Sequence, residues 1–353
     1  MTSQDVKQRA GELGFDLCGV ARAASYPELT FLNEWLGRGY HGTMAYMARN
    51  AEKRLDVRLV LPSARSVVVL GTIYNTGAPS SLEQADPRAA VISRYAWGDD
   101  YHDVVGHRLA ELERWMRKRA GEGFEARRYV DTGPVLERVF AQHAGLGWIG
   151  QNTCLINPGL GSWLFLAEII CNAELAADDE PIVDHCGTCR LCIESCPTGA
   201  LVGDRVLDST RCISYLTIEL KEIVPEALRE GIGRHIYGCD ICQEVCPWNA
   251  DAAAARSGDP AWQPRAAFTD TDLLKLWRMS DDELKTAIKG TPMTRVRVKR
   301  LRRNLAIAIG NCSDPGAVHV FDEPVDAPSV LDPLVQEHIE WARARARSTD
   351  RQT

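Results

Sequence analysis

The chain has 353 residues, 45% of them hydrophobic, and a formal net charge of −7. This length predicts two or three domains, and the composition is sufficient for a full apolar core. The negative charge excludes recruitment of nucleic acid by the overall field, so any such contact requires a local basic patch.

The first residues carry no export signal. Residues 1–14 are polar, and Val6, Ala10 and Leu13 recur at helical spacing, which fits neither a signal peptide nor a twin-arginine leader. Apolar runs elsewhere fall short of the roughly 18–20 residues that a membrane helix requires. We therefore expect a cytoplasmic monomer with no membrane partner, in a compartment that suits free thiols.

Residues 1–175 mix strand and helix patterns and are expected to form one α+β domain. The β-branched run 66–70 predicts a buried strand, and the apolar run 162–171 predicts another. Between them, residues 104–120 carry apolar side chains at the spacing of a helix.

A turn in this domain joins a strand to a helix. Residues 127–130 predict a short strand that ends at Asp131, and Pro134 is expected to open a helix through Ala144 because proline suits the first helical turn. Asp131 has two interpretations: it caps the helix, or it donates a proton in a cleft. A carboxylic acid donates protons near neutral pH when burial raises its pKa, and the sequence leaves that burial open.

The next segment contains the pattern G-x-G-x-x-G at Gly145, Gly147 and Gly150. A dinucleotide site requires a strand before this pattern and a helix after it. Here a predicted helix precedes the glycines, and an extended stretch over residues 151–156 follows them. We therefore expect these glycines to bind no dinucleotide.

Eight of the twelve cysteines lie between residues 186 and 246. The first run, Cys186 to Cys196, has the bacterial-ferredoxin spacing C-x2-C-x2-C-x3-C-P. The second run, Cys239 to Cys246, holds three cysteines, and Cys212 completes the eight thiolates that two [4Fe-4S] clusters require. This spacing fits a zinc site less well, because zinc usually takes four ligands from two C-x2-C pairs. It also fits a disulfide framework less well.

The fourth cysteine of a ferredoxin run binds the other cluster, so we assign the ligands in a crossed manner. One cluster takes Cys186, Cys189, Cys192 and Cys246, and the other takes Cys196, Cys212, Cys239 and Cys242. The remaining cysteines are expected to pack as small, buried apolar side chains without a chemical role. They are Cys18, Cys154, Cys171 and Cys312.

Residues 176–255 are expected to form this cluster domain, and residues 256–353 a helical tail. Residues 303–309 begin one predicted helix, and an Asp-Pro pair opens another over 332–341, which is typical of a helical repeat. A basic run accompanies the first helix: Arg295, Arg297, Lys299, Arg300, Arg302 and Arg303. This run is either a solvated helix face or a patch that contacts phosphates.

Two buried clusters need an electron acceptor, and the N-terminal domain is larger than an electron carrier requires. A flavin and a corrinoid could both serve as the catalytic centre there. The stretch from Asp100 to Gly106 differs by one residue from the D-x-H-x-x-G motif that supplies a histidine to corrinoid cobalt. A corrinoid in this chain would therefore lack that histidine ligand.

Several longer segments occur in this order: Arg94–His102 (RYAWGDDYH), Asp131–Arg138 (DTGPVLER), Trp148–Thr153 (WIGQNT), Gly161–Phe165 (GSWLF), Arg211–Ile218 (RCISYLTI) and Tyr237–Asn249 (YGCDICQEVCPWN). These segments are similar to those of epoxyqueuosine reductases, and the resemblance runs from about Arg54 to about Asn311. The tail after Cys312 is shorter than the usual helical domain of that family.

The resemblance implies a nitroreductase-like α/β domain that binds cobalamin, a ferredoxin-like domain with two [4Fe-4S] clusters and a HEAT-like helical tail. The family is also similar to corrinoid reductive dehalogenases. By resemblance, Asp131 is the proton donor and Lys221 lies near tRNA. The segments around the corrinoid would include Arg54, Gln151, Asn152, Ser214 and Tyr215.

The implied reaction is the last step of queuosine synthesis, in which the epoxide on the wobble nucleoside of tRNA is reduced to an alkene. An external donor would feed the clusters, the clusters would feed cobalamin, and Asp131 would protonate the departing oxygen. A wobble base in a single-stranded loop can be splayed into a pocket. Two alternatives remain, namely a dehalogenase-like corrinoid enzyme acting on a small molecule and an electron-transfer protein without corrinoid.

Overall fold

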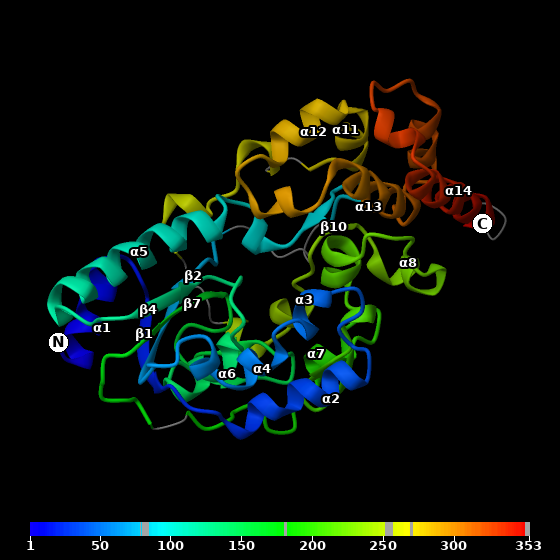
Figure 1. Ribbon diagram of the computed structural model, residues 1–353. Coiled ribbons are helices and arrows are strands. Elements are labelled where there is room, and N and C mark those ends of the chain that lie inside the picture. Colours follow the sequence, from blue (N-terminus) through cyan, green and yellow to red (C-terminus); the bar gives the residue numbers. More distant parts are fainter. Residues whose placement is uncertain (78, 80–84, 180–181, 251–256, 269–270, 350–353) are drawn as a thin grey trace.

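The computed structural model describes residues 1–77, 79, 85–179, 182–250, 257–268 and 271–349 (Figure 1). The strands are β1 (Leu17–Arg22), β2 (Ser66–Ile73), β3 (Val91–Ile92), β4 (Ala126–Tyr129), β5 (Trp148–Ile149), β6 (Leu155–Ile156), β7 (Leu164–Cys171), β8 (Leu201–Gly203), β9 (Val206–Leu207) and β10 (His235–Tyr237). The helices are α1 (Ser3–Glu12), α2 (Phe31–Gly37), α3 (Ala45–Ala48), α4 (Ala51–Leu55), α5 (Tyr101–Ala120), α6 (Glu137–His143), α7 (Leu191–Glu194), α8 (Glu226–Ile232), α9 (Ile241–Glu244), α10 (Pro247–Ala250), α11 (Leu273–Arg278), α12 (Asp281–Ile288), α13 (Val298–Gly310) and α14 (Pro333–Thr349).

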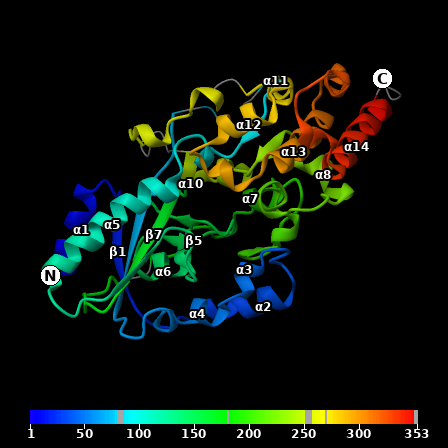
Figure 2. The ribbon, with the colours of Figure 1, turned by 45° about the horizontal axis from the view of Figure 1, so that its top comes forward.

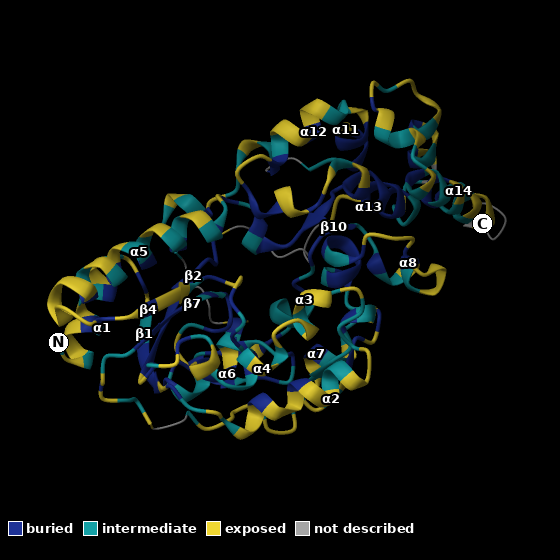
Figure 3. Ribbon diagram, in the orientation of Figure 1, coloured by how far each residue is buried: buried dark blue, intermediate teal, exposed yellow. Residues whose placement is uncertain are grey.

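The main sheet is antiparallel and has the order β1-β2-β7-β4. Its two central strands confirm the strands predicted at 66–70 and 162–171, and the edge strand β4 confirms the one at 127–130. Every residue of β2 is buried, and Figure 3 shows the centre of the sheet in dark blue. The mixture of helices with this sheet confirms the α+β class.

Helices cover both faces of the sheet, α1 and α5 on one side and α6 on the other (Figures 1 and 2). Alternate side chains of a strand point to opposite faces, so Val68 and Leu70 pack with α1 and α5, whereas Val67 and Val69 pack with α6. Each such buried side chain contributes roughly 1.5–3 kcal/mol relative to an exposed one. Burial on both faces explains the continuous apolar sequence of β2.

The helix predicted over residues 104–120 is confirmed as α5, and it begins at Tyr101 because Asp100 caps it. Asp100 Oδ1 accepts the backbone N–H of His102 at 3.1 Å. The helix predicted from Pro134 begins only at Glu137, since the preceding turn is not helical. Asp131 has a φ of 56°, in the left-handed region, and starts that turn.

The G-x-G-x-x-G pattern lies between a helix and an extended segment, as the sequence predicted. Helix α6 precedes it, and its last residues lie in the hairpin of β5 and β6. A Cβ atom on Gly147 would lie 2.2 Å from the carbonyl oxygen of Ile156. The close approach of two backbone segments in this hairpin therefore explains the glycine at that position.

The cluster segment consists of short elements between the sheet and the C-terminal helices. It contains α7, α9 and the hairpin of β8 and β9, and β10 pairs in parallel with β3. The pairing of β3 with β10 ties residues 91–92 to the chain that directly precedes the second cysteine run.

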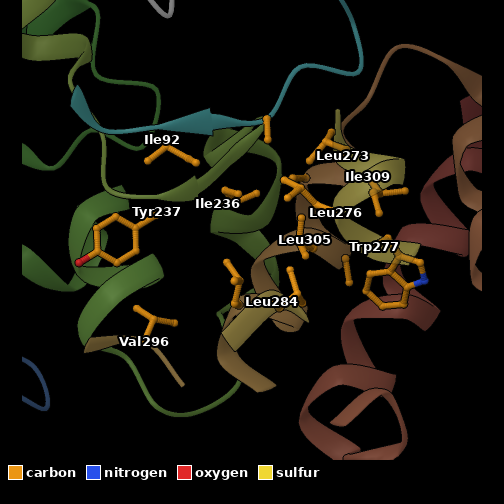
Figure 4. Packing of buried hydrophobic residues seen from close by; sticks show 14 of the residues in the cluster. Ile92, Ile236, Tyr237, Leu273, Leu276, Trp277, Leu284, Val296, Leu305 and Ile309 are labelled. Carbon is orange, nitrogen blue, oxygen red and sulfur yellow. The ribbon is translucent and has the colours of Figure 1, made fainter. Parts of the chain in front are cut away.

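The C-terminal helices confirm the predicted helical tail and share one apolar core with β3 and β10 (Figure 4). Ile92 and Ile236 meet Leu276 of α11 and Leu305 of α13 in this core. The helix predicted at 303–309 begins earlier, at Val298, whereas α14 begins at Pro333 as expected from the Asp-Pro pair. The domain limit after residue 175 stays a prediction, and the limit at 255 lies outside the described residues.

Among the described residues, no helix combines the length and the apolar composition that crossing a membrane requires.

Candidate active site and cluster segment

Asp131 lies in the turn between β4 and α6, and its side chain is 56% exposed. The hydroxyl of Tyr101 donates to Asp131 Oδ2 at 2.6 Å, and His102 Nε2 lies 3.9 Å from the same oxygen. His102 Nδ1 in turn lies 2.8 Å from Asp100 Oδ1. The carboxylate of Asp131 therefore contacts the first turn of α5. Among the described residues, no side chain makes a capping hydrogen bond at the start of α6, so the capping interpretation is wrong.

Side chains from two other segments face the same place. Arg295 ends the 3₁₀ turn Pro292–Arg295, and its Nη2 lies 2.7 Å from Glu219 Oε1. The guanidinium of Arg295 lies 5.8 Å from the ring centre of Tyr46, which belongs to α3. Burial and the charge of Glu219 raise the pKa of Tyr46 to about 12, and the Asp131 carboxylate adds to the rise. Asp131 is thus within electrostatic range of Tyr46.

The first group of thiols combines both cysteine runs. Burial raises the pKa of Cys192, and the charges of Cys186 and Cys189 raise it further. Burial also raises the pKa of Cys246 to about 11, with Cys186 and Cys192 adding to the effect. Cys246, from the second run, therefore lies beside the first three cysteines. The indole N–H of Trp148 donates to Cys186 Sγ at 3.4 Å.

The second group contains the remaining four cysteines of the segment. Burial raises the pKa of Cys212, and the charge of Cys196 adds to this. Burial raises the pKa of Cys239 as well, with Cys212 and Cys196 as its charged neighbours. Cys242 has a pKa well above its usual value for the same reasons, with Cys239 and Cys212 nearby. The structure thus brings Cys212 to the second run.

The donor set suits two iron–sulfur clusters. All eight cysteines are free of disulfide bonds. The part of the chain that the structure describes holds no three Cys, His, Asp or Glu side chains close enough to bind one metal ion together. Four thiols around a cubane are spaced more widely than around a single ion, because each thiolate binds its own iron.

The turn of the hairpin between β5 and β6 lies against the second cysteine run. Asn152 is buried, its Nδ2 donates to the carbonyl oxygen of Cys242 at 3.2 Å, and its Oδ1 accepts the N–H of Cys154 at 3.1 Å. Gln151 Oε1 is buried with no hydrogen-bond partner among the described residues. Gln151 also lines a cavity of about 250 Å³ together with Arg190. This turn therefore presents one unused buried acceptor beside the cluster segment.

Cys154, to which the sequence assigned no chemistry, lies between the two groups of thiols. It acts as a charged neighbour of Cys212 and Cys242 in one group and of Cys246 in the other. It is therefore the alternative to Cys212 as a cluster ligand, and the two thiols need separate tests.

Ser214 and Tyr215 open the π-helical turn Tyr215–Glu219, which follows the second group of thiols. The Tyr215 hydroxyl accepts the backbone N–H of Thr43 at 2.9 Å, which fixes the loop before α3. Arg54 in α4 is buried and donates to the carbonyl oxygen of Arg49 at 2.9 Å. The residues that the resemblance places around the corrinoid thus come from three separate segments.

Arg300, Arg302 and Arg303 do not lie on the surface. All three are buried, and their guanidinium groups donate to backbone carbonyls. Helix ends leave their last carbonyls without helical partners. Arg300 and Arg303 satisfy such carbonyls in and after the π-helical turn, and Arg302 satisfies those at the end of α11. The prediction that these three residues contact phosphates is therefore wrong. The acceptors are the carbonyls of Arg295, Leu216, Ile218, Leu220, Glu222, Trp277 and Met279.

Four of the predicted tRNA-contacting cations remain exposed, namely Lys221, Arg295, Arg297 and Lys299. Lys299 Nζ lies 3.1 Å from Asp332 Oδ2, and Arg295 pairs with Glu219 as described above. The exposed cations all follow the π-helical turn in sequence, and the buried Arg300 and Arg303 donate to carbonyls in and just after that turn.

Family models match two parts of the chain. Residues 185–249 match the 4Fe-4S double cluster binding domain, and residues 54–132 match Epoxyqueuosine reductase QueG, DUF1730. An epoxyqueuosine reductase of Pseudomonas aeruginosa is 39% identical over 348 residues, which cover 98% of this chain and 95% of that protein. The chain belongs to the epoxyqueuosine reductase family.

Solved epoxyqueuosine reductases have the same fold. One of them, in complex with an epoxyqueuosine-modified tRNA-Tyr stem loop, is 29% identical with a TM-score of 0.85, over 97% of this chain and 89% of that one. Another, from Bacillus subtilis, has its catalytic aspartate loop swung out of the active site. It is 30% identical with a TM-score of 0.84, over 97% of this chain and 90% of that one.

Sequence reasoning missed three side chains near Asp131 in this epoxyqueuosine reductase fold, namely Tyr101, Glu137 and Glu168. A signal existed for Glu168, because it is the one acidic residue in the apolar run 162–171. No sequence signal pairs Glu168 with Glu137 or Tyr101 with Asp131, since each pair meets only through packing on the sheet.

Proposed function

We propose that this protein reduces epoxyqueuosine to queuosine at the wobble position of tRNA. The observation that carries the proposal is the match to an epoxyqueuosine reductase across 98% of the chain. The site supports the proposal in two ways. Asp131 lies in a partly exposed turn, where the hydroxyl of Tyr101 donates a hydrogen bond to it. The same chain also carries eight free thiols in two groups. The solved relative in complex with a modified tRNA stem loop supports tRNA as the substrate.

The proposed cluster ligands follow the two groups of thiols. Cys186, Cys189, Cys192 and Cys246 would hold one [4Fe-4S] cluster, and Cys196, Cys212, Cys239 and Cys242 the other. Support comes from the mutual charge effects within each group and from the double-cluster family model over residues 185–249.

Cobalamin is the third proposed cofactor, implied by the family. Gln151 supports this assignment with its buried acceptor that lacks a partner, and Asn152, Ser214, Tyr215 and Arg54 would complete the surroundings. When bound, the clusters supply electrons singly and cobalamin holds the reducing equivalent that reaches the substrate.

The role proposed for Asp131 is that of a general acid. Conversion of the epoxide to an alkene breaks both C–O bonds, consumes two electrons and two protons, and releases the oxygen as water. An alkoxide is a poor leaving group, so a proton on the departing oxygen lowers the barrier. Tyr101 holds Asp131 Oδ2, which orients the carboxyl group toward the exposed side of the turn.

The proposal retains the finer fold assignment, with a nitroreductase-like domain over residues 1–175, a ferredoxin-like domain over 176–255 and a HEAT-like tail over 256–353. An external electron donor would reduce the clusters, and the cytoplasm, where tRNA and reduced thiols occur, would be the compartment.

The function is tested by anaerobic reconstitution with iron, sulfide and cobalamin, followed by nucleoside analysis of tRNA that carries the epoxide. We expect conversion of epoxyqueuosine to queuosine that depends on a low-potential reductant. Cluster reduction without conversion would favour an electron-transfer protein, and dehalogenation of an organohalide without action on tRNA would favour the dehalogenase alternative.

The exposed cations are expected to contribute to tRNA affinity. Neutralising Lys221, Arg297 and Lys299 together should weaken binding and flatten the dependence of log K on log salt by up to about one unit for each lost phosphate contact. The matched control neutralises three exposed cations of α5, namely Arg114, Lys118 and Arg119. Binding should be measured at several salt concentrations, and equal slopes for both variants would exclude phosphate contacts by the first set.

A further inference from the structure

A carboxyl group occupies the apolar face between the sheet and α6. Glu168 lies in the middle of β7, fully buried, and pairs in register with Val69 of β2 and Tyr129 of β4. Its neighbours at alternate positions of β7, Leu166 and Ile170, belong to the apolar cluster on that face. Such a position excludes a lone ionised carboxylate, because its desolvation would be too costly.

Glu137 is the charged neighbour of Glu168, and its charge adds to the rise that burial causes in the pKa of Glu168. Neither oxygen of Glu168 has a hydrogen-bond partner among the described residues. A fully buried carboxylate without a donor is too costly to keep ionised, so one of the two carboxyl groups must carry a proton. Two neighbouring carboxyls of like charge can share one proton, as in other carboxyl dyads.

An oxygen of Glu137 contacts Asp131. Glu137 Oε1 accepts the backbone N–H of Asp131 at 2.7 Å, at the point where the chain takes its left-handed conformation. The rest of the turn packs on Tyr129, since a Cβ on Gly133 would lie 2.4 Å from Cγ of that ring. The turn thus rests on two groups, the ring of Tyr129 and the carboxyl of Glu137.

We propose that Glu137 and Glu168 form a positioning pair that shares one proton and holds the turn of Asp131 so that its carboxyl group faces the substrate. This inference rests on the proposed function for the role of Asp131, whereas the shared proton itself does not depend on it. Neither glutamate touches the substrate, and both act through the backbone of Asp131.

The charges around the pair give it a pH dependence. Burial raises the pKa of Glu137 to about 8, and the charge of Asp131 adds to the rise, while Arg138 on α6 opposes it. Burial, Glu137 and Asp131 place the pKa of Glu168 well above its usual value. β2 contributes only apolar Val69 opposite the pair, and β4 contributes Tyr129. Loss of the shared proton would put two negative charges beside Asp131 and loosen the turn.

The sign of the stability effect follows from the raised pKa. The shared proton stabilises the folded protein fully below the ordinary glutamate pKa of 4.5, and this stabilisation is lost as the pH rises through about 8. Glu168→Gln keeps the shape, donates an amide N–H to Glu137 and does not titrate. The melting temperature of Glu168→Gln minus that of the wild type should therefore increase from pH 5 to pH 8.

The first measurement is infrared spectroscopy of the holoenzyme at pH 7, independent of activity. The wild type should show the carbonyl band of a protonated, buried carboxylic acid, and Glu168→Gln should lack it. Glu122→Gln, in the exposed turn after α5, is the matched control and should keep the band. Absence of the band in the wild type would overturn the shared proton, even if the enzyme reduces epoxyqueuosine.

The second measurement is the pH profile of the single-turnover rate. Above pH 8, the logarithm of the wild-type rate should fall more steeply than that of Glu168→Gln, by about one unit per pH unit, since only the wild-type pair has a shared proton to lose. Equal slopes would overturn the positioning role, and a wild type inactive on tRNA at every pH would instead contradict the proposed function while the infrared result stands.

A third comparison isolates the bond to the backbone of Asp131. Glu137→Leu removes the acceptor and should slow the reaction by about 10²-fold with iron and corrinoid retained. Glu137→Gln keeps an acceptor oxygen and should restore most of the rate. A wild-type rate in Glu137→Leu would overturn the proposal, and if that variant does not fold, the pH profile of Glu168→Gln decides.

Discussion

Replacement of Asp131 with Asn is expected to slow alkene formation by about 10²–10⁴-fold, the usual contribution of a general acid. Asn has nearly the same size and tolerates the left-handed backbone that Asp131 adopts at φ 56°. Its amide oxygen can still accept the hydrogen bond of Tyr101, but the amide gives up no proton near neutral pH. The substitution therefore removes the proton and leaves the turn intact.

The measurement pairs the single-turnover rate with iron and corrinoid content on the same preparation. Asp103→Asn is the matched control, because Asp103 is exposed in the first turn of α5 and has the same chemistry. An unchanged rate in Asp131→Asn with full cofactors would remove Asp131 from the mechanism. Loss of corrinoid together with the rate would make it a structural residue of the site.

Replacement of Cys212 with Ala is expected to reduce the iron content from about eight to about four atoms per chain. Cys212 lies with Cys196 and Cys239, so its loss should damage one cluster. Cys212 is not among the neighbours described above for the group of Cys186 and Cys246. That group should therefore keep its iron. Electron transfer to the substrate should then fail, because a chain of two centres is interrupted.

Cys154→Ala is the decisive comparison, because Cys154 is a charged neighbour of thiols in both groups, Cys212 among them. We expect this variant to keep about eight iron atoms. Iron and sulfide analysis of both variants under anaerobic conditions checks the assignment. Full iron in Cys212→Ala with iron loss in Cys154→Ala would make Cys154 the eighth ligand.

The arginine run shows where periodicity fails as a guide to exposure. Arg300, Arg302 and Arg303 have the sequence of a solvated or phosphate-binding helix face, yet they are buried. The positions of Arg300 and Arg303 depend on carbonyls in or just after a π-helical turn some eighty residues earlier in the chain, as the bonds of Arg300 to Ile218 and Arg303 to Leu220 illustrate. Arg302 instead bonds to carbonyls at the end of α11. Local spacing carries no information about such a partner.

The start of α6 was misplaced for a related reason. Proline is favourable in a first helical turn, which placed the start at Pro134. The structure begins the helix at Glu137, because Asp131 takes a left-handed conformation and its N–H is bonded by the Glu137 side chain. A competing side-chain acceptor, and not the propensity of the proline, determines where the helix begins.

The sequence by itself determined the features that depend on local spacing: the iron–sulfur cysteine runs, the buried strand 66–70, the helix over 104–120 and the family to which the matching segments belong. Only the tertiary structure decided which distant groups meet. It brought Cys246 to Cys186, Tyr101 to Asp131, and Glu137 to Glu168 across the face of the sheet. The physical reason is that spacing along a chain fixes which face of an element a residue occupies, whereas burial, shared protons and satisfied carbonyls arise only when two faces pack.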